Sequence, residues 1–269
     1  MIVEVADAAD PRLDSFRWRE RQLSTRRDRR EKVALGLFVA EGDLVVERAI
    51  AAGCEAVAML CAADAGHAIA MSVDPLVPVY VADDALRKEV TGLGVPLRAT
   101  GLFRRPAPVD ADDLMARSRR LVVAEAVDNP TNLGAVVRSA AALGWDGLLL
   151  DATSADPLAR RALRVSMGTG LVLPFARLSP GESVADLCSR HACTSVALSP
   201  DAPVTISQIP RVEGRLALLL GSERAGLTAE VLHSADVVAR IPMHAGVDSL
   251  NVGAAAAIAL HALGPDATG

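Results

Sequence analysis

The strongest structural signal in the sequence is Arg120-Leu-Val-Val-Ala-Glu-Ala-Val-Asp-Asn-Pro-Thr-Asn-Leu-Gly134. It begins with a continuous apolar run, which is typical of a strand buried on both faces of a parallel sheet. A polar turn then leads into an apolar segment that predicts a helix over 133–143. Similar strands are expected at 147–151, 194–199, 216–220 and 237–241, and helices near 157–167, 183–191, 228–234 and 250–263. This alternation predicts an α/β fold with a doubly wound parallel sheet, whose ligands lie beyond the carboxyl ends of the strands.

The first half of the chain shows shorter alternating elements. A polar helix is expected over 11–28, strands near 36–40, 55–60, 77–81 and 97–103, and helices near 43–52, 66–72 and 83–90. The segment 105–113 has two prolines and a cluster of acids and lacks apolar periodicity, so it marks a boundary. The chain of 269 residues is long enough for two domains. We therefore expect a smaller N-terminal α/β domain over 1–105, a linker over 106–113 and a second domain over 114–269.

Composition excludes several classes of protein. Apolar residues make up 51% of the chain, which rules out a disordered protein. The longest strongly apolar run, 252–263, is broken by His261 and is too short to cross a bilayer, so no membrane association is expected. No basic segment precedes an apolar one at the N-terminus, so a secretory signal is not expected. The four cysteines match neither a zinc site nor a disulfide framework, which indicates reduced thiols, a cytoplasmic protein and no bound metal.

Arginine dominates the basic residues, although the formal net charge is −5. Only two of the 28 basic residues are lysines. Between Arg17 and Lys32 there are eight basic residues against three acids, a local excess of five. Arginine suits phosphate contact and base stacking. A charge run of this kind can equally be a solvated helix face with internal ion pairs. Composition alone leaves both interpretations open.

Three strand ends in the second half carry polar clusters. The first, 128–134, opens a helix that is apolar almost all round but contains Arg138. An arginine there must extend to solvent, pair with a carboxylate or serve a ligand, and on this ground alone structural pairing is favoured. The second, 220–227, has two glycines, which suit close backbone approach to a ligand or simply a tight connection. The third, 241–251, predicts Asp248 or Ser249 as a helix N-cap, with Asn251 in the first turn.

Other nucleotide-binding and catalytic classes lack their motifs. No Gly-x-Gly-x-x-Gly follows a strand, and neither a P-loop nor a Gly-x-Ser-x-Gly elbow is present. The five histidines are scattered without metal-ligand spacing. An unrelated nucleotide-binding α/β enzyme therefore has no supporting motif.

In order and spacing, the three clusters resemble the motifs of the SpoU/TrmH branch of the SPOUT methyltransferases. The matching segments are Asp128-Asn-Pro-Thr-Asn-Leu-Gly-Ala-Val-Val-Arg-Ser-Ala140, Leu219-Leu-Gly-Ser-Glu-Arg-Ala-Gly-Leu227 and Ile241-Pro-Met243 with Ser249-Leu-Asn-Val-Gly-Ala254. Arg160-Arg-Ala-Leu-Arg-Val-Ser-Met-Gly168 and Phe38-Val-Ala-Glu-Gly42 also resemble family segments, the latter in its RNA-binding N-terminal domain. The likeness thus spans residues 12–263. Thr131 stands where the family often has glycine, so the backbone angle there can differ.

This resemblance implies a deep trefoil knot in the second domain, an exception to the usual absence of knots. It also implies S-adenosylmethionine as cofactor, a 2′-O-methylated ribose in RNA as product, and a homodimer with active sites close to the subunit interface. Two-domain members more often modify ribosomal RNA, which favours 23S rRNA. The alternatives are a tRNA ribose 2′-O-methyltransferase and a non-catalytic RNA-binding factor on the same fold. Retention of all the catalytic positions argues against the latter.

The resemblance also assigns site residues. The catalytic set is Asn132, Arg138, Glu223, Ser249 and Asn251. The cofactor set is Ser199, Pro200, Gly221, Ser222, Glu223, Ile241, Met243, Ser249, Leu250 and Asn251. The residues expected to contact RNA are Arg26, Arg27, Arg29, Arg30, Arg138, Arg160, Arg161 and Arg164.

The implied reaction is an in-line attack of a ribose 2′-oxygen on the methyl group of a sulfonium. Arginine stays protonated in proteins, so we expect Arg138 to stabilise the developing alkoxide and orient a phosphate rather than act as a base. Asn132, Ser249 and Asn251 would hold the reactants in register. Glu223 would pair with an arginine or, alternatively, accept the proton.

Overall fold

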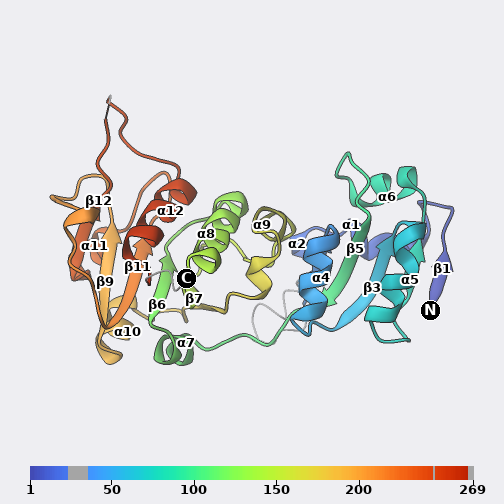
Figure 1. Ribbon diagram of the computed structural model, residues 1–269, viewed down its shortest axis with the longest axis horizontal. Coiled ribbons are helices and arrows are strands. Elements are labelled where there is room, and N and C mark those ends of the chain that lie inside the picture. The colour runs from blue at the N-terminus through green and yellow to red at the C-terminus, as the bar shows by residue number, and fades with distance from the viewer. Residues whose placement is uncertain (24–35, 245, 266–269) are drawn as a thin grey trace. The chain divides into compact units, whose positions relative to one another are not determined.

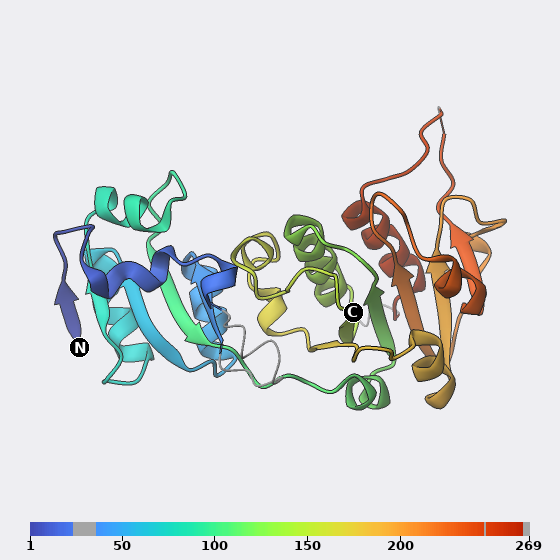
Figure 2. The same ribbon diagram turned by 180° about the vertical axis from the view of Figure 1, so that it is seen from behind.

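The computed structural model describes residues 1–23, 36–244 and 246–265, and the chain forms two compact units (Figures 1 and 2). The first unit contains Met1–Pro108 and Leu158–Val172, and the second contains Val109–Pro157 and Leu173–Gly269. The chain therefore passes from one unit to the other at three places. Residues 158–172, which the sequence analysis places in the second domain, pack with the first unit instead.

Among the described residues, the second unit is built on a seven-stranded sheet in which every strand pair is parallel. In spatial order the strands are β10 (Val204–Thr205), β12 (Val237–Arg240), β9 (Cys193–Leu198), β11 (Arg215–Leu220), β6 (Arg120–Ala124), β7 (Gly147–Leu150) and β8 (Phe175–Arg177). The predicted parallel sheet is thus confirmed, and each predicted strand agrees within one residue at either end. The edge strands β8 and β10 were missed, because two or three residues make too short an apolar run.

Helices cover both faces of this sheet. Val122 and Ala124 of β6 pack against α8 (Pro130–Ala142) and α12 (Val252–Leu263). The alternate residues Leu121 and Val123 lie in a second core, together with residues of α7 (Ala111–Arg117), α10 (Val184–Arg190) and α11 (Ala229–Ser234). Helices α8 and α12 lie side by side in Figures 1 and 2. A Cβ at Gly253 would lie 2.9 Å from that of Ala135, so a glycine permits this close approach.

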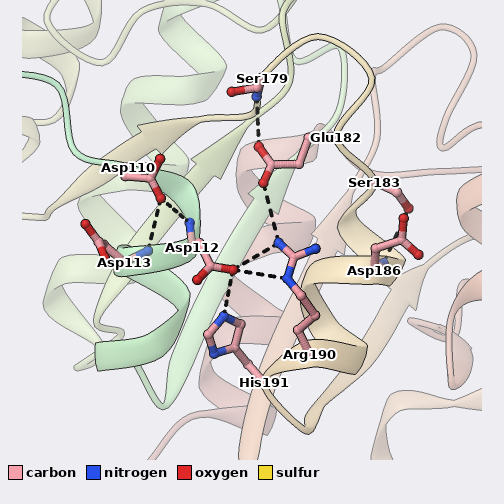
Figure 3. Close-up of polar contacts among 9 residues, drawn as sticks. All are labelled: Asp110, Asp112, Asp113, Ser179, Glu182, Ser183, Asp186, Arg190 and His191. Carbon is pink, nitrogen blue, oxygen red and sulfur yellow. Dashed lines mark hydrogen bonds and ion pairs between the residues drawn. The ribbon is translucent and has the colours of Figure 1, made fainter.

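A polar cluster joins α7 to α10 (Figure 3). Asp110 caps α7 by accepting hydrogen bonds from backbone N–H groups two and three residues later. Asp112 accepts from Arg190 Nη2 (2.9 Å), and its Oδ1 lies 3.0 Å from His191 Nε2. Hydrogen bonds from His191 and then from Arg190 lower the pKa of Asp112. The linker predicted over 106–113 is therefore wrong at its end, because its acids serve as the cap and first turn of a helix.

The first unit has a mixed five-stranded sheet in the described part of the chain. Its spatial order is β1 (Ile2–Glu4), β4 (Val79–Val81), β3 (Ala56–Cys61), β5 (Ala99–Arg104) and β2 (Leu37–Glu41), with β5 antiparallel to both neighbours. Its longer helices are α4 (Asp43–Ala51), α5 (Ala63–Ser72) and α6 (Asp84–Thr91). Apart from the helix over 11–28, the predicted helices and strands of this half are found, and β1 is an addition.

The polar helix predicted over 11–28 is wrong as a single element. The chain forms a 3-10 turn (Pro11–Leu13) and two short helices, α1 (Asp14–Arg17) and α2 (Glu20–Leu23). Trp18 between them has an extended backbone and packs against the core that buries Phe16, so tertiary packing overrides the helical pattern. The predicted RNA contacts Arg26, Arg27, Arg29 and Arg30 lie outside the described residues.

Buried Glu41, the last residue of β2, explains why residues 158–172 belong to the first unit. Its carboxylate binds both Arg160 and Arg164 of α9 (Arg160–Val165), with Arg160 Nε 2.7 Å from Oε1. The Nη1 of Arg160 also donates to the carbonyls of Phe16 and Trp18 at 3.1 Å. Two predicted RNA contacts are therefore engaged inside the unit, whereas Arg161 of the same helix is exposed.

We expect Glu41→Ala to lower the free energy of unfolding by about 3–5 kcal/mol, because it leaves the guanidinium of Arg160, whose side chain is only 12% exposed, without its carboxylate. Urea denaturation followed by circular dichroism measures this change. Glu55→Ala is a matched control, since Glu55 pairs with Arg104 at the surface, and should cost less than about 1 kcal/mol. Equal costs for the two variants would contradict the assignment.

Three further observations concern the described residues. None of their helices has the length and apolarity needed to span a membrane. None of their His, Cys, Asp and Glu side chains form a group that could hold a metal ion. The cysteines, Cys54, Cys61, Cys188 and Cys193, are all free thiols.

Candidate active site

Three polar side chains from distant parts of the second unit meet near the carboxyl ends of its strands. The Nδ2 of Asn251 donates to Oδ1 of Asn132 at 3.0 Å and to Oε1 of Glu223 at 2.5 Å. The first pair is separated by 119 residues and the second by 28. The segments that follow β6, β11 and β12 therefore contribute to one site.

Asn132 lies in the first turn of α8. Asn129 caps this helix by accepting the N–H of Thr131 at 2.9 Å, and Pro130 occupies its first position. The side chain of Asn132 is buried, with 7% of the residue exposed. A buried amide needs hydrogen-bond partners, and Asn251 supplies one.

Glu223 lies at the tip of a closed loop. Ser222 and Gly226 exchange backbone hydrogen bonds of 3.2 and 3.0 Å across the base of this loop. Gly226 has a φ of +70°, which favours glycine. A Cβ at Gly221 would lie 2.2 Å from the backbone of Gly226 and Leu227. The two glycines are thus required for the loop to fold back on itself and present the exposed Glu223.

Asn251 is the N-cap of α12. Its backbone is non-helical, and its Oδ1 accepts the N–H of Gly253 at 3.0 Å. The expectation that Asp248 or Ser249 caps this helix is therefore wrong by two or three residues. Asparagine is favoured at an N-cap, so its poor propensity inside helices does not apply. One side chain thus caps α12 and joins the other two loops.

Arg138 is not part of this group. It is exposed on α8 and makes no hydrogen bond or ion pair with any residue that the structure describes. Six residues separate it from Asn132, which places it about 9 Å along the helix and about 120° around it. The structural pairing favoured for Arg138 on sequence grounds is therefore absent from the described part of the chain.

The predicted cofactor residues lie at the same edge of the sheet. Ser199, Gly221 and Ile241 directly follow β9, β11 and β12, with β9 lying between the other two. Pro200 and Ser222 are the next residues along. Between Ile241 and Asn251 the described backbone forms neither helix nor strand, so peptide groups are available to a ligand. Met243 is half-buried and Leu250 is 38% exposed, which provides apolar surface beside these groups. Ser249 is exposed. Such a surface fits a purine and an aminoacyl chain.

A cavity of about 640 Å³ opens beside Glu223. It is lined by Ala126, Asp128, Asn129, Thr153 and the loop 222–225. Asp128 and Arg224 are exposed there and have no side-chain partner among the described residues. The cavity therefore offers a carboxylate and a guanidinium that are both free to bind a ligand.

Sequence reasoning missed two carboxylates that hold these loops. Glu125 directly follows β6 and binds Thr228, which caps α11, while Asp151 directly follows β7 and binds the N–H of Ala126. Each stands at the end of an apolar strand, which is the signal that marked the other site residues. The sequence did not predict them as site residues because each is a single acid rather than part of a polar cluster.

Comparison with known proteins gives consistent matches. Residues 119–261 match the model of the SpoU rRNA Methylase family. An uncharacterized tRNA/rRNA methyltransferase of Mycobacterium tuberculosis is 37% identical over 97% of this chain and 91% of its own. A 23S rRNA (guanosine(2553)-2′-O)-methyltransferase of Bacillus subtilis is 27% identical over 87% of this chain and 91% of its own. The crystal structure of an AdoMet-bound rRNA methyltransferase from Sinorhizobium meliloti matches with a TM-score of 0.82 and 25% identity, covering 97% of both chains.

The parallel sheet, the converging loops and these matches define an RNA methyltransferase that uses S-adenosylmethionine. The glycine-closed loop and the described backbone at 241–244 and 246–250, which forms neither helix nor strand, suit that cofactor. The chain belongs to the SpoU rRNA methylase family.

Proposed function

We propose that this protein methylates a ribose 2′-hydroxyl of 23S rRNA, as a homodimer in the cytoplasm. The observation that carries the proposal is the contact of Asn251 with both Asn132 and Glu223. The named Bacillus subtilis relative, which acts on a 2′-oxygen of 23S rRNA, supports the substrate. The trefoil knot of the second domain belongs to the same proposal and is supported by the family.

S-adenosylmethionine, when bound, supplies a methyl group already activated by the positive sulfonium. The protein must then align the ribose oxygen and ease the loss of its proton. The residues that would hold the cofactor are Ser199, Pro200, Gly221, Ser222, Ile241, Met243, Ser249 and Leu250. Asn251 would fix Asn132 and Glu223 in register at the reacting group.

Two groups can deal with the proton and the charge of the ribose oxygen. Glu223 accepts a hydrogen bond from Asn251 through Oε1 rather than pairing with an arginine among the described residues, which leaves Oε2 available to accept the proton. The guanidinium of Arg138 would stabilise the developing alkoxide. This division gives the acid–base role to a carboxylate and the electrostatic role to a guanidinium.

The cavity beside Glu223 is the proposed site of the target nucleotide. Arg224 can bind a phosphate, and Asp128 can accept a hydrogen bond from a base amino group. Both groups are exposed on the cavity wall.

Two features support the homodimer. The outer face of α12 exposes Ile258, one turn beyond the exposed Ala254, and Leu250 lies just before the helix. A second copy would cover this apolar stripe. Arg138 is exposed on the neighbouring helix α8, about 9 Å along the helix and about 120° around it from Asn132. We therefore place Arg138 in the site of the partner subunit.

Transfer of labelled methyl groups to RNA tests the function. Ribosomal RNA and tRNA from cells lacking this protein are incubated with it and labelled S-adenosylmethionine, then hydrolysed with alkali. A 2′-O-methyl group blocks cleavage of the adjacent phosphodiester, so we expect label in alkali-resistant dinucleotides of 23S rRNA. Label in mononucleotides, in tRNA alone or nowhere would overturn the proposal.

We expect Gly221→Ala to weaken binding of S-adenosylmethionine by at least about tenfold. The added Cβ would overlap the backbone of Gly226 and Leu227, so the loop must move. Isothermal titration calorimetry measures the dissociation constant. Gly214→Ala is the matched control, because a Cβ there meets nothing within 4 Å. Unchanged binding by the Gly221 variant would remove this loop from the cofactor site.

Reversing the charge of Arg26, Arg27, Arg29 and Arg30 to glutamate is expected to weaken RNA binding and to flatten its salt dependence. Each lost phosphate contact reduces the number of counterions released on binding. Filter binding of 23S rRNA fragments at several salt concentrations gives both quantities. Binding and slope equal to those of the wild type would assign this stretch to the solvated surface.

A further inference from the structure

Ala126 has a backbone conformation that side chains rarely adopt. Its φ is +54°, and it is one of three non-glycine residues with positive φ in the described ranges. It stands two residues after β6 and begins the loop that leads through Asp128 and Asn129 into α8. A left-handed alanine is costly, so the surrounding structure must hold it there.

Asp151 supplies that hold. Its Oδ1 accepts the N–H of Ala126 at 3.1 Å and that of Ser154 at 2.8 Å, and its Oδ2 accepts the N–H of Thr153 at 3.1 Å and the Thr153 hydroxyl. Both oxygens are therefore used, and the carboxylate joins the turn after β7 to the loop after β6. All the donors belong to this turn or to Ala126.

Ser154 makes the second link between the same two segments. Its hydroxyl accepts the N–H of Val127 and donates to the carbonyl of Ala124, both at 3.1 Å. The N–H of Ala155 also donates to the carbonyl of Val127 at 2.9 Å. The turn fixed by Asp151 thus grips the loop on both sides of Ala126.

Glu125, the residue before Ala126, holds the glycine-closed loop that carries Glu223. Its carboxylate accepts the N–H of Thr228 at 2.8 Å and the Thr228 hydroxyl at 2.9 Å. Thr228 follows the glycine-closed loop that carries Glu223 and caps α11. Hydrogen bonds around Ala126 therefore fix two loops. Those of Asp151 and Ser154 fix the loop that leads into α8, and those of Glu125 fix the loop that carries Glu223.

We propose that Asp151 and Glu125 are positioning residues for methyl transfer, which keep Asn132 and Glu223 in register with Asn251. Asp151 acts by holding Ala126 left-handed, and Glu125 acts by anchoring Thr228. Neither touches the reacting groups. This inference rests on the proposed function and adds to it the residues that set the geometry of its site.

The ionisation of Asp151 is consistent with this role. Burial acts to raise its pKa, but hydrogen bonds from Ser154, Thr153 and the N–H of Ala126 outweigh burial and hold the pKa below its ordinary value. The carboxylate is therefore charged at neutral pH and acts only as an acceptor.

Asp151→Asn tests the proposal, because an amide of the same shape cannot accept all four hydrogen bonds. We expect kcat for RNA methylation to fall by about 10- to 100-fold. The dissociation constant for S-adenosylmethionine should stay within about threefold of the wild type, since the cofactor residues lie on other loops. Glu125→Ala should also lower kcat, because it releases Thr228 and with it the loop that carries Glu223.

A second substitution separates positioning from general stability. Glycine adopts positive φ without strain, so Ala126→Gly in the Asp151→Asn background should restore kcat by about tenfold. Asp146→Asn is the matched control, because that carboxylate accepts the N–H groups of Arg119 and Arg120 at 2.7 and 2.8 Å at the opposite end of β6. It should lower the melting temperature but leave kcat unchanged.

Hydrogen exchange of the peptide that covers 121–133 gives a readout independent of RNA. Asp151→Asn should speed exchange there, and Ala126→Gly should slow it again in the double variant. A wild-type protein that methylates no RNA would overturn the proposed function. The exchange data would still test whether Asp151 fixes the loop that begins at Ala126. Wild-type kcat in Asp151→Asn, an equal loss of kcat in Asp146→Asn, or no restoration by Ala126→Gly would overturn the positioning role.

Discussion

Replacing Arg138 by alanine is expected to abolish methyl transfer while binding of S-adenosylmethionine survives. Removing a group that stabilises charge only in the transition state costs about 10²- to 10³-fold in kcat. Arg138 pairs with no residue in the described structure and is exposed, so its loss should leave the fold intact. A methylation assay and a cofactor titration on the same preparation measure both quantities. Near-normal turnover would refute the role.

Mixed dimers decide in which subunit Arg138 acts. Arg138→Ala and Asn251→Ala subunits are co-expressed, so that half of the dimers carry one of each. If Arg138 serves the site of the partner, one site of each mixed dimer is complete, and about one quarter of wild-type activity is expected. If Arg138 serves its own chain, every site carries a defect. The absence of activity in the mixture would therefore contradict the proposed interface.

Asn251 is expected to show the second large effect, because one side chain makes three contacts. Asn251→Asp keeps an N-cap acceptor but replaces the amide donor by a carboxylate that faces Oδ1 of Asn132 and Oε1 of Glu223, so kcat should fall by about 10²-fold. Asn251→Ala also removes the cap and should lower the free energy of unfolding by about 1–3 kcal/mol. Kinetics and urea denaturation of both variants separate the two roles.

Comparing Asn251→Asp with Asn251→Ala separates catalysis from helix capping. Equal activity of Asn251→Asp and wild type would show that capping of α12 is the whole role of this residue. Equal stability of Asn251→Ala and wild type would show that the cap contributes nothing.

Apolar patterning predicted the parallel sheet because its strands are buried on both faces, which leaves continuous apolar runs such as 216–220. It missed β8 and β10, which are too short to show a pattern. It also predicted one helix over 11–28, where packing of Trp18 against the core imposes an extended residue. Periodicity reports local preference, and long-range packing overrides it.

The site was predicted in its residues but not in its contacts. Motif resemblance named Asn132, Glu223 and Asn251, and the structure joins them through one amide. Helical spacing separates Arg138 from Asn132 by about 120°, but no sequence pattern indicates which of the two faces the converging loops, because that follows from how α8 packs on the sheet. Nor does any pattern indicate that Arg160 and Arg164 bind Glu41, which is 119 and 123 residues away.

The excursion of residues 158–172 into the first unit bears on how the protein can be divided. A fragment that starts at Val109 would keep α9 but lose Glu41, so two guanidinium groups and the apolar side of that helix would face water. Truncation at Val109 is therefore expected to yield an aggregation-prone fragment rather than an independently folded enzyme. If 158–172 were also replaced by a short polar linker, the second unit would no longer expose this helix.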